Sequence, residues 1–194
     1  MSVAHVEFLV EEPSMETFLR GLLPRLLGEV SFGIRTFQCK TDLLEKLPQR
    51  LRGYAAWYPE NYRIVVLVDR DDEDCLELKE TLERDAWSVG LPTRTRPRGA
   101  HFTVINRIVI EELEAWYFGD WDAVRAAYRD PDAINGGTWE AFERILQKRG
   151  YFETGLRKIE AARAIAPHMD PTRNSSHSFQ VFREALAELV GQGT

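Results

Sequence analysis

Short apolar runs in the first half of the chain predict the strands of a small sheet. Residues 63–68 (RIVVLV) form the clearest run, which is branched and apolar after its first residue. Such a run is typical of a central parallel strand, because both of its faces are covered. Residues 3–10 form a similar run, residues 30–34 alternate between apolar and small or polar, and residues 101–107 (HFTVINR) predict a fourth strand.

Helical spacing of apolar residues separates these strands. Residues 14–27 place leucine and phenylalanine on one helical face, with Pro24 expected to break or kink the helix. Residues 41–52 predict a second helix, with a bend at Pro48, and residues 72–87 an acidic third. Alternating strands and helices indicate an α/β layered core with a small parallel sheet.

The second half of the chain contains no convincing strand. We therefore expect an α/β core over residues 1–110 and a helical extension, residues 111–194, packed on it. Helices are predicted over residues 110–118, 121–128, 138–148, 156–166 and 178–190.

Composition narrows the function classes. With 194 residues, 44% hydrophobic and 29% charged, the chain can bury a core, and its net charge of −6 excludes a polycation that coats nucleic acid. No apolar run approaches the ~20 residues that span a bilayer. The N-terminus lacks the pattern of a secretory signal, and Cys39 and Cys75 form no metal-type cluster. We expect a cytoplasmic protein that does not bind membranes.

Acidic residues concentrate where strands end. Residues 69–85 contain nine acidic and three basic side chains, and Asp69 and Asp71 directly follow the clearest strand. Glu11 and Glu12 follow the first strand, and ligands of parallel sheets bind at the carboxyl ends of strands. If the two strands are neighbours, these carboxylates meet, and Mg²⁺ or Mn²⁺ would offset their repulsion. The alternative for each residue alone is a helix cap or an exposed loop acid.

Other acid-based α/β sites fit less well. A receiver domain needs its acid pair after the first strand and a later strand-end lysine, and a haloacid-dehalogenase-type phosphatase needs Asp-x-Asp after the first strand. The chain also contains neither G-x-x-x-x-G-K-[ST] nor G-x-G-x-x-G, which argues against nucleotide binding of those kinds.

A strand ending in Glu, a helix and a strand ending in Asp-x-Asp resemble the Toprim pattern. More closely, the chain resembles the small Toprim-like proteins of the DUF4276 family. This resemblance implies a metal-dependent nuclease, encoded in phage-defence gene clusters and often beside an AAA-type ATPase. The matching segments are FLVEEPSMETFLRGLL (8–23), RIVVLVDRDDEDCLELK (63–79), IEELEAWYFGD (110–120) and MDPTRNSSHSFQVF (169–182).

The resemblance also assigns roles to single residues. Glu11 matches the Toprim glutamate, which acts as general acid/base or metal ligand, and Asp69 and Asp71 match the metal-binding Asp-x-Asp. Glu114 and Asp120 match the E-x-W…D element of the family, with Glu114 as a further metal ligand.

Basic side chains that could contact phosphate lie later in the chain. The segment 91–107 contains four arginines and no acid, so it is either a phosphate-contacting edge beside the metal or a solvated loop. In the extension, Arg173 could instead pair with a carboxylate or hold the extension to the core. The candidate substrate-binding residues are Arg94, Arg96, Arg98, Arg107, Lys158 and Arg173.

The sequence thus predicts an Mg²⁺- or Mn²⁺-dependent nuclease acting on DNA or RNA, with an AAA-type ATPase as partner. Glu12 occupies the position where the family usually has glycine, which favours the alternative of a non-catalytic partner subunit of such an ATPase. Phosphoryl or nucleotidyl transfer to a small molecule is a further alternative, which would need a closed pocket. The choice between DNA and RNA, the number of metal ions and the formation of a homo-oligomer stay open.

Overall fold

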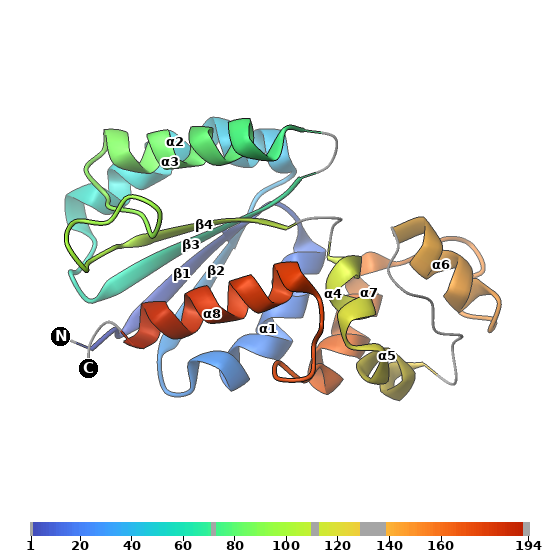
Figure 1. The fold of residues 1–194 in the computed structure, drawn as a ribbon. Coiled ribbons are helices and arrows are strands. Elements are labelled where there is room, and N and C mark those ends of the chain that lie inside the picture. The colour runs from blue at the N-terminus through green and yellow to red at the C-terminus, as the bar shows by residue number, and fades with distance from the viewer. Residues whose placement is uncertain (1, 71–72, 110–112, 129–138, 192–194) are drawn as a thin grey trace.

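Four parallel strands form a single sheet in the order β2-β1-β3-β4 in the computed structural model (Figure 1), which describes residues 2–70, 73–109, 113–128 and 139–191. The strands are β1 (His5–Val10), β2 (Ser31–Thr36), β3 (Tyr62–Asp69) and β4 (Val104–Val109). β3 is buried from Arg63 to Asp69, as its apolar sequence predicts for a central strand. The predicted α/β class with a small parallel sheet is therefore confirmed.

Helices cover both faces of the sheet, α2 and α3 on one face and α1 and α8 on the other (Figure 1). Alternate residues of β3 serve the two layers: Val66 packs with the α2 and α3 side chains, and Val65 packs with those of α1 and α8. The helices are α1 (Pro13–Leu27), α2 (Lys40–Trp57), α3 (Cys75–Ser88), α4 (Glu114–Gly119), α5 (Trp121–Ala127), α6 (Trp139–Gln147), α7 (Lys158–Ile165), the 3₁₀ helix η1 (Ala166–His168) and α8 (His177–Gly191).

Neither helical proline ends its helix. α1 continues through Pro24 to Leu27 and α2 continues through Pro48 to Trp57, so the second helix is longer than predicted. Leu27 and the α2 residues beyond Pro48 lie in the core, and this burial offsets the backbone hydrogen bond that each proline removes. None of the described helices combines the length and apolar character needed to cross a lipid bilayer.

The third helix also begins later than predicted. Asp74 is its N-cap, and its carboxylate accepts hydrogen bonds from the backbone N–H groups of Leu76 (2.8 Å) and Glu77 (3.0 Å). Asp69 therefore does not cap this helix.

The helical extension shares one hydrophobic core with the α/β part. The ring of Trp116 on α4 stacks on Phe182 of α8 with 5.1 Å between centroids, and it lies 5.7 Å from the Phe18 ring of α1. α8 itself forms part of the layer beneath the sheet (Figure 1). The extension is therefore built into the core.

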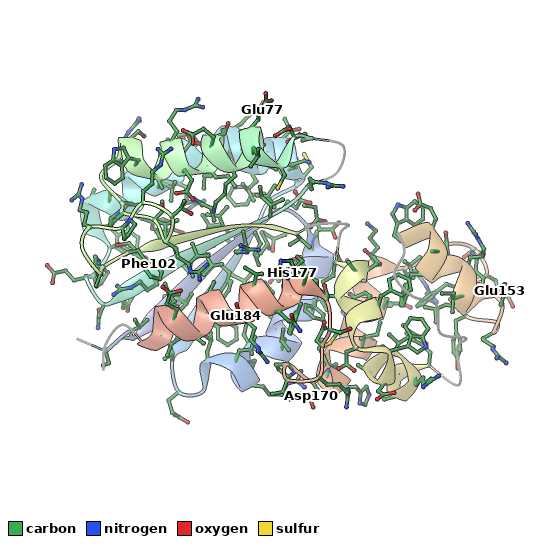
Figure 2. The ribbon with its side chains drawn as sticks, in the orientation of Figure 1. Glu77, Phe102, Glu153, Asp170, His177 and Glu184 are labelled. Atoms are coloured by element: carbon green, nitrogen blue, oxygen red, sulfur yellow. The ribbon has the colours of Figure 1, made fainter. Side chains whose placement is uncertain are left out.

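An ion pair between the buried Asp120 and the exposed Arg173 joins the end of α4 to the loop before α8. Arg173 donates from Nε (2.7 Å) and Nη2 (3.1 Å) to the two oxygens of the buried Asp120, and the backbone N–H of Asp170 also donates to Asp120 (2.6 Å). Asn174 donates to the backbone oxygen of Trp116 (2.8 Å). Figure 2 labels Asp170 on this loop. Residues 114–120 and 169–182 thus fold against each other, and we call this junction the clasp.

The clasp needs glycine at its centre. A Cβ atom at Gly119 would collide with Asn174 Oδ1 and lie 2.7 Å from the backbone nitrogen of Ser176. We expect Gly119→Ala to lower the free energy of unfolding by about 1–3 kcal/mol in urea denaturation. Gly53→Ala in α2 is the matched control, because a Cβ there meets nothing within 4 Å, and should raise it by about 0.5–1 kcal/mol. Equal effects of the two substitutions would contradict the close packing at Gly119.

Candidate metal site at the carboxyl edge of the sheet

The carboxylates predicted to meet come from neighbouring strands. β1 lies beside β3 with Val10 opposite Leu67, so Glu11 leaves β1 next to the end of β3, where Asp69 is the last residue. Glu114 begins α4, shortly after the end of β4. The exposed fractions are 9% for Glu11, 4% for Asp69 and 1% for Glu114. Three acids from three segments are therefore withdrawn from water at the same edge of the sheet.

The hydroxyl of Tyr117 on α4 is affected by the negative charges at this edge. Its side chain is fully buried, and its pKa is raised well above the ordinary value by burial and then by the negative charges of Glu114, Glu12 and Asp69. Within the described residues, the hydroxyl finds no hydrogen-bond partner. A buried polar group left without a partner is costly, and it is a common sign of a site for water, an ion or a ligand.

Lys40 holds a positive charge at the end of β3. Its Nζ donates to the backbone oxygens of Asp69 and Arg70, both at 3.1 Å, and forms an ion pair with Glu73 at 3.5 Å. The sequence analysis missed this residue. The available signal was a lysine at the first position of a helix, where the helix dipole disfavours a cation.

Glu12 adds a further carboxylate to this edge. It is the N-cap residue of α1 in extended conformation, followed by Pro13, and its Oε1 accepts a hydrogen bond from the hydroxyl of Ser14. The positive end of the helix dipole favours this charge. Replacing the usual family glycine therefore makes the edge more acidic.

The donor set is of the type that hard dications prefer, because it consists of carboxylate oxygens. Within the described ranges, however, no group of three or more His, Cys, Asp or Glu side chains could by itself hold a metal ion. Asp71, the second aspartate of the predicted Asp-x-Asp, lies outside the described residues. The carboxylate oxygens are thus suitable donors for a hard dication. The described carboxylates alone do not form a complete set of metal ligands.

The arginine loop does not reach these carboxylates. Arg94, Arg96 and Arg98 precede β4, and the segment before a parallel strand lies at the amino edge of the sheet, whereas the carboxylates lie at the carboxyl edge. Arg94 pairs with Glu188 (2.6 Å) and Arg96 pairs with Glu80 (2.7 Å). The expected phosphate-contacting edge beside the carboxylates is therefore wrong for this loop.

The other predicted cations lie at three separate places. Arg107 lies within β4, opposite Leu67, and is half-buried. Lys158 begins α7, with Nζ 5.8 Å from the ring centroid of Trp139. Arg173 is engaged in the clasp. Their role in substrate binding stays a prediction.

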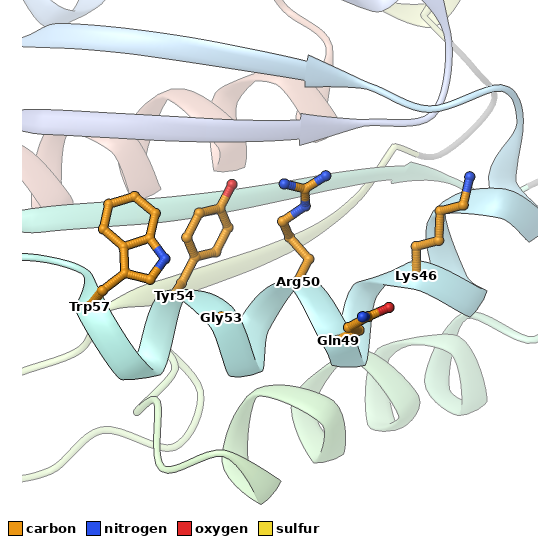
Figure 3. A pocket seen from close by; sticks show the side chains of 6 residues that line it. All are labelled: Lys46, Gln49, Arg50, Gly53, Tyr54 and Trp57. Carbon is orange, nitrogen blue, oxygen red and sulfur yellow. The ribbon is translucent and has the colours of Figure 1, made fainter.

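A hollow along α2 carries cations that the sequence analysis did not select (Figure 3). The hollow has a volume of about 420 Å³, and Lys46, Arg50, Tyr54 and Trp57 line it. Arg50 is exposed and has no ion pair within the described residues. Because α2 begins with Lys40 at the carboxyl edge, Arg50 lies about 15 Å further along the helix.

The fold is that of an α/β protein with buried carboxylates at the carboxyl edge of a parallel sheet. The chain belongs to the DUF4276 family: the family model described as "Domain of unknown function (DUF4276)" matches residues 10–187. This confirms the family expected from the sequence segments. No curated protein and no solved structure matches the chain.

The unpartnered hydroxyl of Tyr117 predicts an unusual stability effect. We expect Tyr117→Phe to raise the free energy of unfolding by about 1 kcal/mol in metal-free buffer, because it removes a buried polar group without a partner. Tyr54→Phe is the control, because that hydroxyl donates to Glu7 Oε1 (3.3 Å), and it should lower stability by about 1 kcal/mol. Urea denaturation measures both changes, and a clear loss of stability in Tyr117→Phe would show that its hydroxyl is bonded.

Proposed function

We propose that this protein is a Toprim-like nuclease that uses Mg²⁺ or Mn²⁺ to hydrolyse phosphodiesters in DNA or RNA. The observation that supports this most is the burial of Glu11, Asp69 and Glu114 from three segments at one edge of the sheet. Buried carboxylates repel one another and lose hydration, and a dication offsets both costs.

In this proposal each residue at the carboxyl edge has its own role. Asp69, Asp71 and Glu11 would hold the metal, with Glu114 as a further ligand. When bound, the metal would supply charge neutralisation of the phosphate and a more acidic water. Glu11 would take or return the proton, and Lys40, held at the end of β3, would face the negative charge of the phosphate.

A nucleic acid must meet local positive charge, because the whole chain carries −6. Lys40, Lys46 and Arg50 follow one another along α2 from the carboxylate edge. Trp57 lies at the far end of the same helix with 67% of its surface exposed, and its ring is available for stacking on a base. We infer that the strand runs along α2 from the carboxylate edge.

The alternative is a non-catalytic subunit that docks on an AAA-type ATPase and regulates it. Two observations favour it: Glu12 stands where the family usually has glycine, and the described carboxylates form no group of three that could hold a metal. The ATPase partner and a role in phage defence rest on the family resemblance under either proposal. Binding of Mn²⁺ distinguishes the two, because the alternative needs none.

Substitution of the proposed ligands tests the nuclease. We expect Asp69→Asn and Glu11→Gln to abolish Mn²⁺-dependent cleavage of plasmid DNA and of structured RNA while both variants stay folded by circular dichroism. Glu77→Gln is the matched control, because this acid lies on α3 within the same acidic stretch and outside the proposed site (Figure 2), and should retain full activity. Full cleavage by both site variants would contradict the nuclease, and a wild-type chain that binds no Mn²⁺ in calorimetry would favour the regulatory subunit.

Charge reversal tests the path of the nucleic acid. Arg50→Glu should weaken binding of a labelled single-stranded oligonucleotide and reduce the slope of log affinity against log salt by about 1, because one phosphate contact is lost. Arg96→Glu is the control, since Arg96 lies at the opposite edge and pairs with Glu80. Fluorescence anisotropy at several salt concentrations without divalent metal measures both. Equal weakening by the two variants would refute a path along α2.

A further inference from the structure

A second hollow lies at the amino edge of the sheet, opposite the carboxylates. It has a volume of about 520 Å³ and is formed by the end of α2, the start of β3 and the loop before β4. This volume is in the range of sites for small organic ligands. Its lining includes Tyr54, Tyr58, Glu60, Arg63, Pro92 and His101.

Arg63 is a buried cation among the residues that line this hollow. Only 3% of the residue is exposed, and no ion pair of the described residues includes it. Its Nη1 donates to the backbone oxygens of Glu60 (2.7 Å) and Tyr62 (2.9 Å), whereas its buried Nε finds no acceptor in the described part of the chain. A buried charge is normally paired, so this guanidinium lacks the anion that its burial calls for.

Two further groups beside Arg63 point to an anion. His101 lines the same hollow, and its pKa is lowered by burial and by the positive charge of Arg63, with Glu60 acting in the opposite direction. The buried hydroxyl of Tyr58 has no hydrogen-bond partner within the described ranges. The hollow therefore combines a buried guanidinium, an imidazole and a hydroxyl donor without a partner in the described ranges, and Glu60 is the one carboxylate among its lining residues.

We propose that this hollow binds a phosphate monoester of about mononucleotide size, with its phosphate on Arg63 and His101. A guanidinium offers several N–H donors in one plane, which suits phosphate oxygens, and the imidazole of His101 can donate one further hydrogen bond. The apolar part of the ligand would lie against Tyr54 and Pro92. The proposal does not rest on the proposed metal site, because the hollow and the carboxylates lie at opposite edges of the sheet.

Isothermal titration calorimetry with the full chain tests this site, with adenosine monophosphate and inorganic phosphate as ligands and adenosine as the phosphate-free comparison. We expect both phosphates to bind and adenosine alone not to. Arg63→Gln should weaken binding of adenosine monophosphate by about tenfold or more, because a charged hydrogen bond is lost. His101→Gln should weaken it by a smaller factor, and His168→Gln on η1, an exposed histidine elsewhere, should leave it unchanged.

Two results would overturn the proposal. The first is a wild-type chain that binds neither phosphate at millimolar concentration. The second is binding that His101→Gln and Arg63→Gln leave intact, because the ligand would then lie elsewhere. Since Arg63 also bonds to two backbone oxygens, its variant needs a check by circular dichroism, and the exposed His101 decides the question if that variant does not fold. Asp69→Asn should keep this binding whatever it does to nucleic-acid cleavage.

Discussion

Three carboxylates are held out of water at one end of a parallel sheet, and the packing around them has to offset their lost hydration. Glu11 and Asp69 are fixed by the pairing of β1 with β3, which is the centre of the sheet. Glu114 is different, because it belongs to a helix of only six residues. That helix keeps its place through Trp116 in the core and through the hydrogen bonds that Arg173 donates to Asp120. The extension therefore positions one of the acids.

Much of this fold can be predicted from local patterns in the sequence. The apolar run at 63–68 predicted the central strand, and helical spacing predicted α1 and the helices of the second half. The same patterns could not give the ends of α2, because burial of its later turns outweighs the local effect of Pro48. Nor could they give the order of strands, which depends on contacts between distant segments.

The candidate site, like the fold, could be predicted from the sequence only in part. Glu11 and Asp69 were found because each directly follows a strand, and a parallel sheet collects such residues at one edge. Tyr117 was missed because its neighbours in sequence are core aromatics, and only its surroundings in space distinguish it. The misplacement of Arg94 and Arg96 is instructive, because the direction of a parallel strand already assigns the loop before it to the opposite edge.

The clasp determines when the acidic edge can form during synthesis of the chain. Asp120 can pair only after Arg173 has been synthesised, 53 positions later in the chain. Helix α8, which packs against Trp116, is synthesised later still. A ribosome-bound chain that already contains all four strands still lacks the support that holds Glu114. The acidic edge is therefore assembled only after α8 has left the ribosome, so a chain terminated before α8 would contain the sheet without the support that holds Glu114.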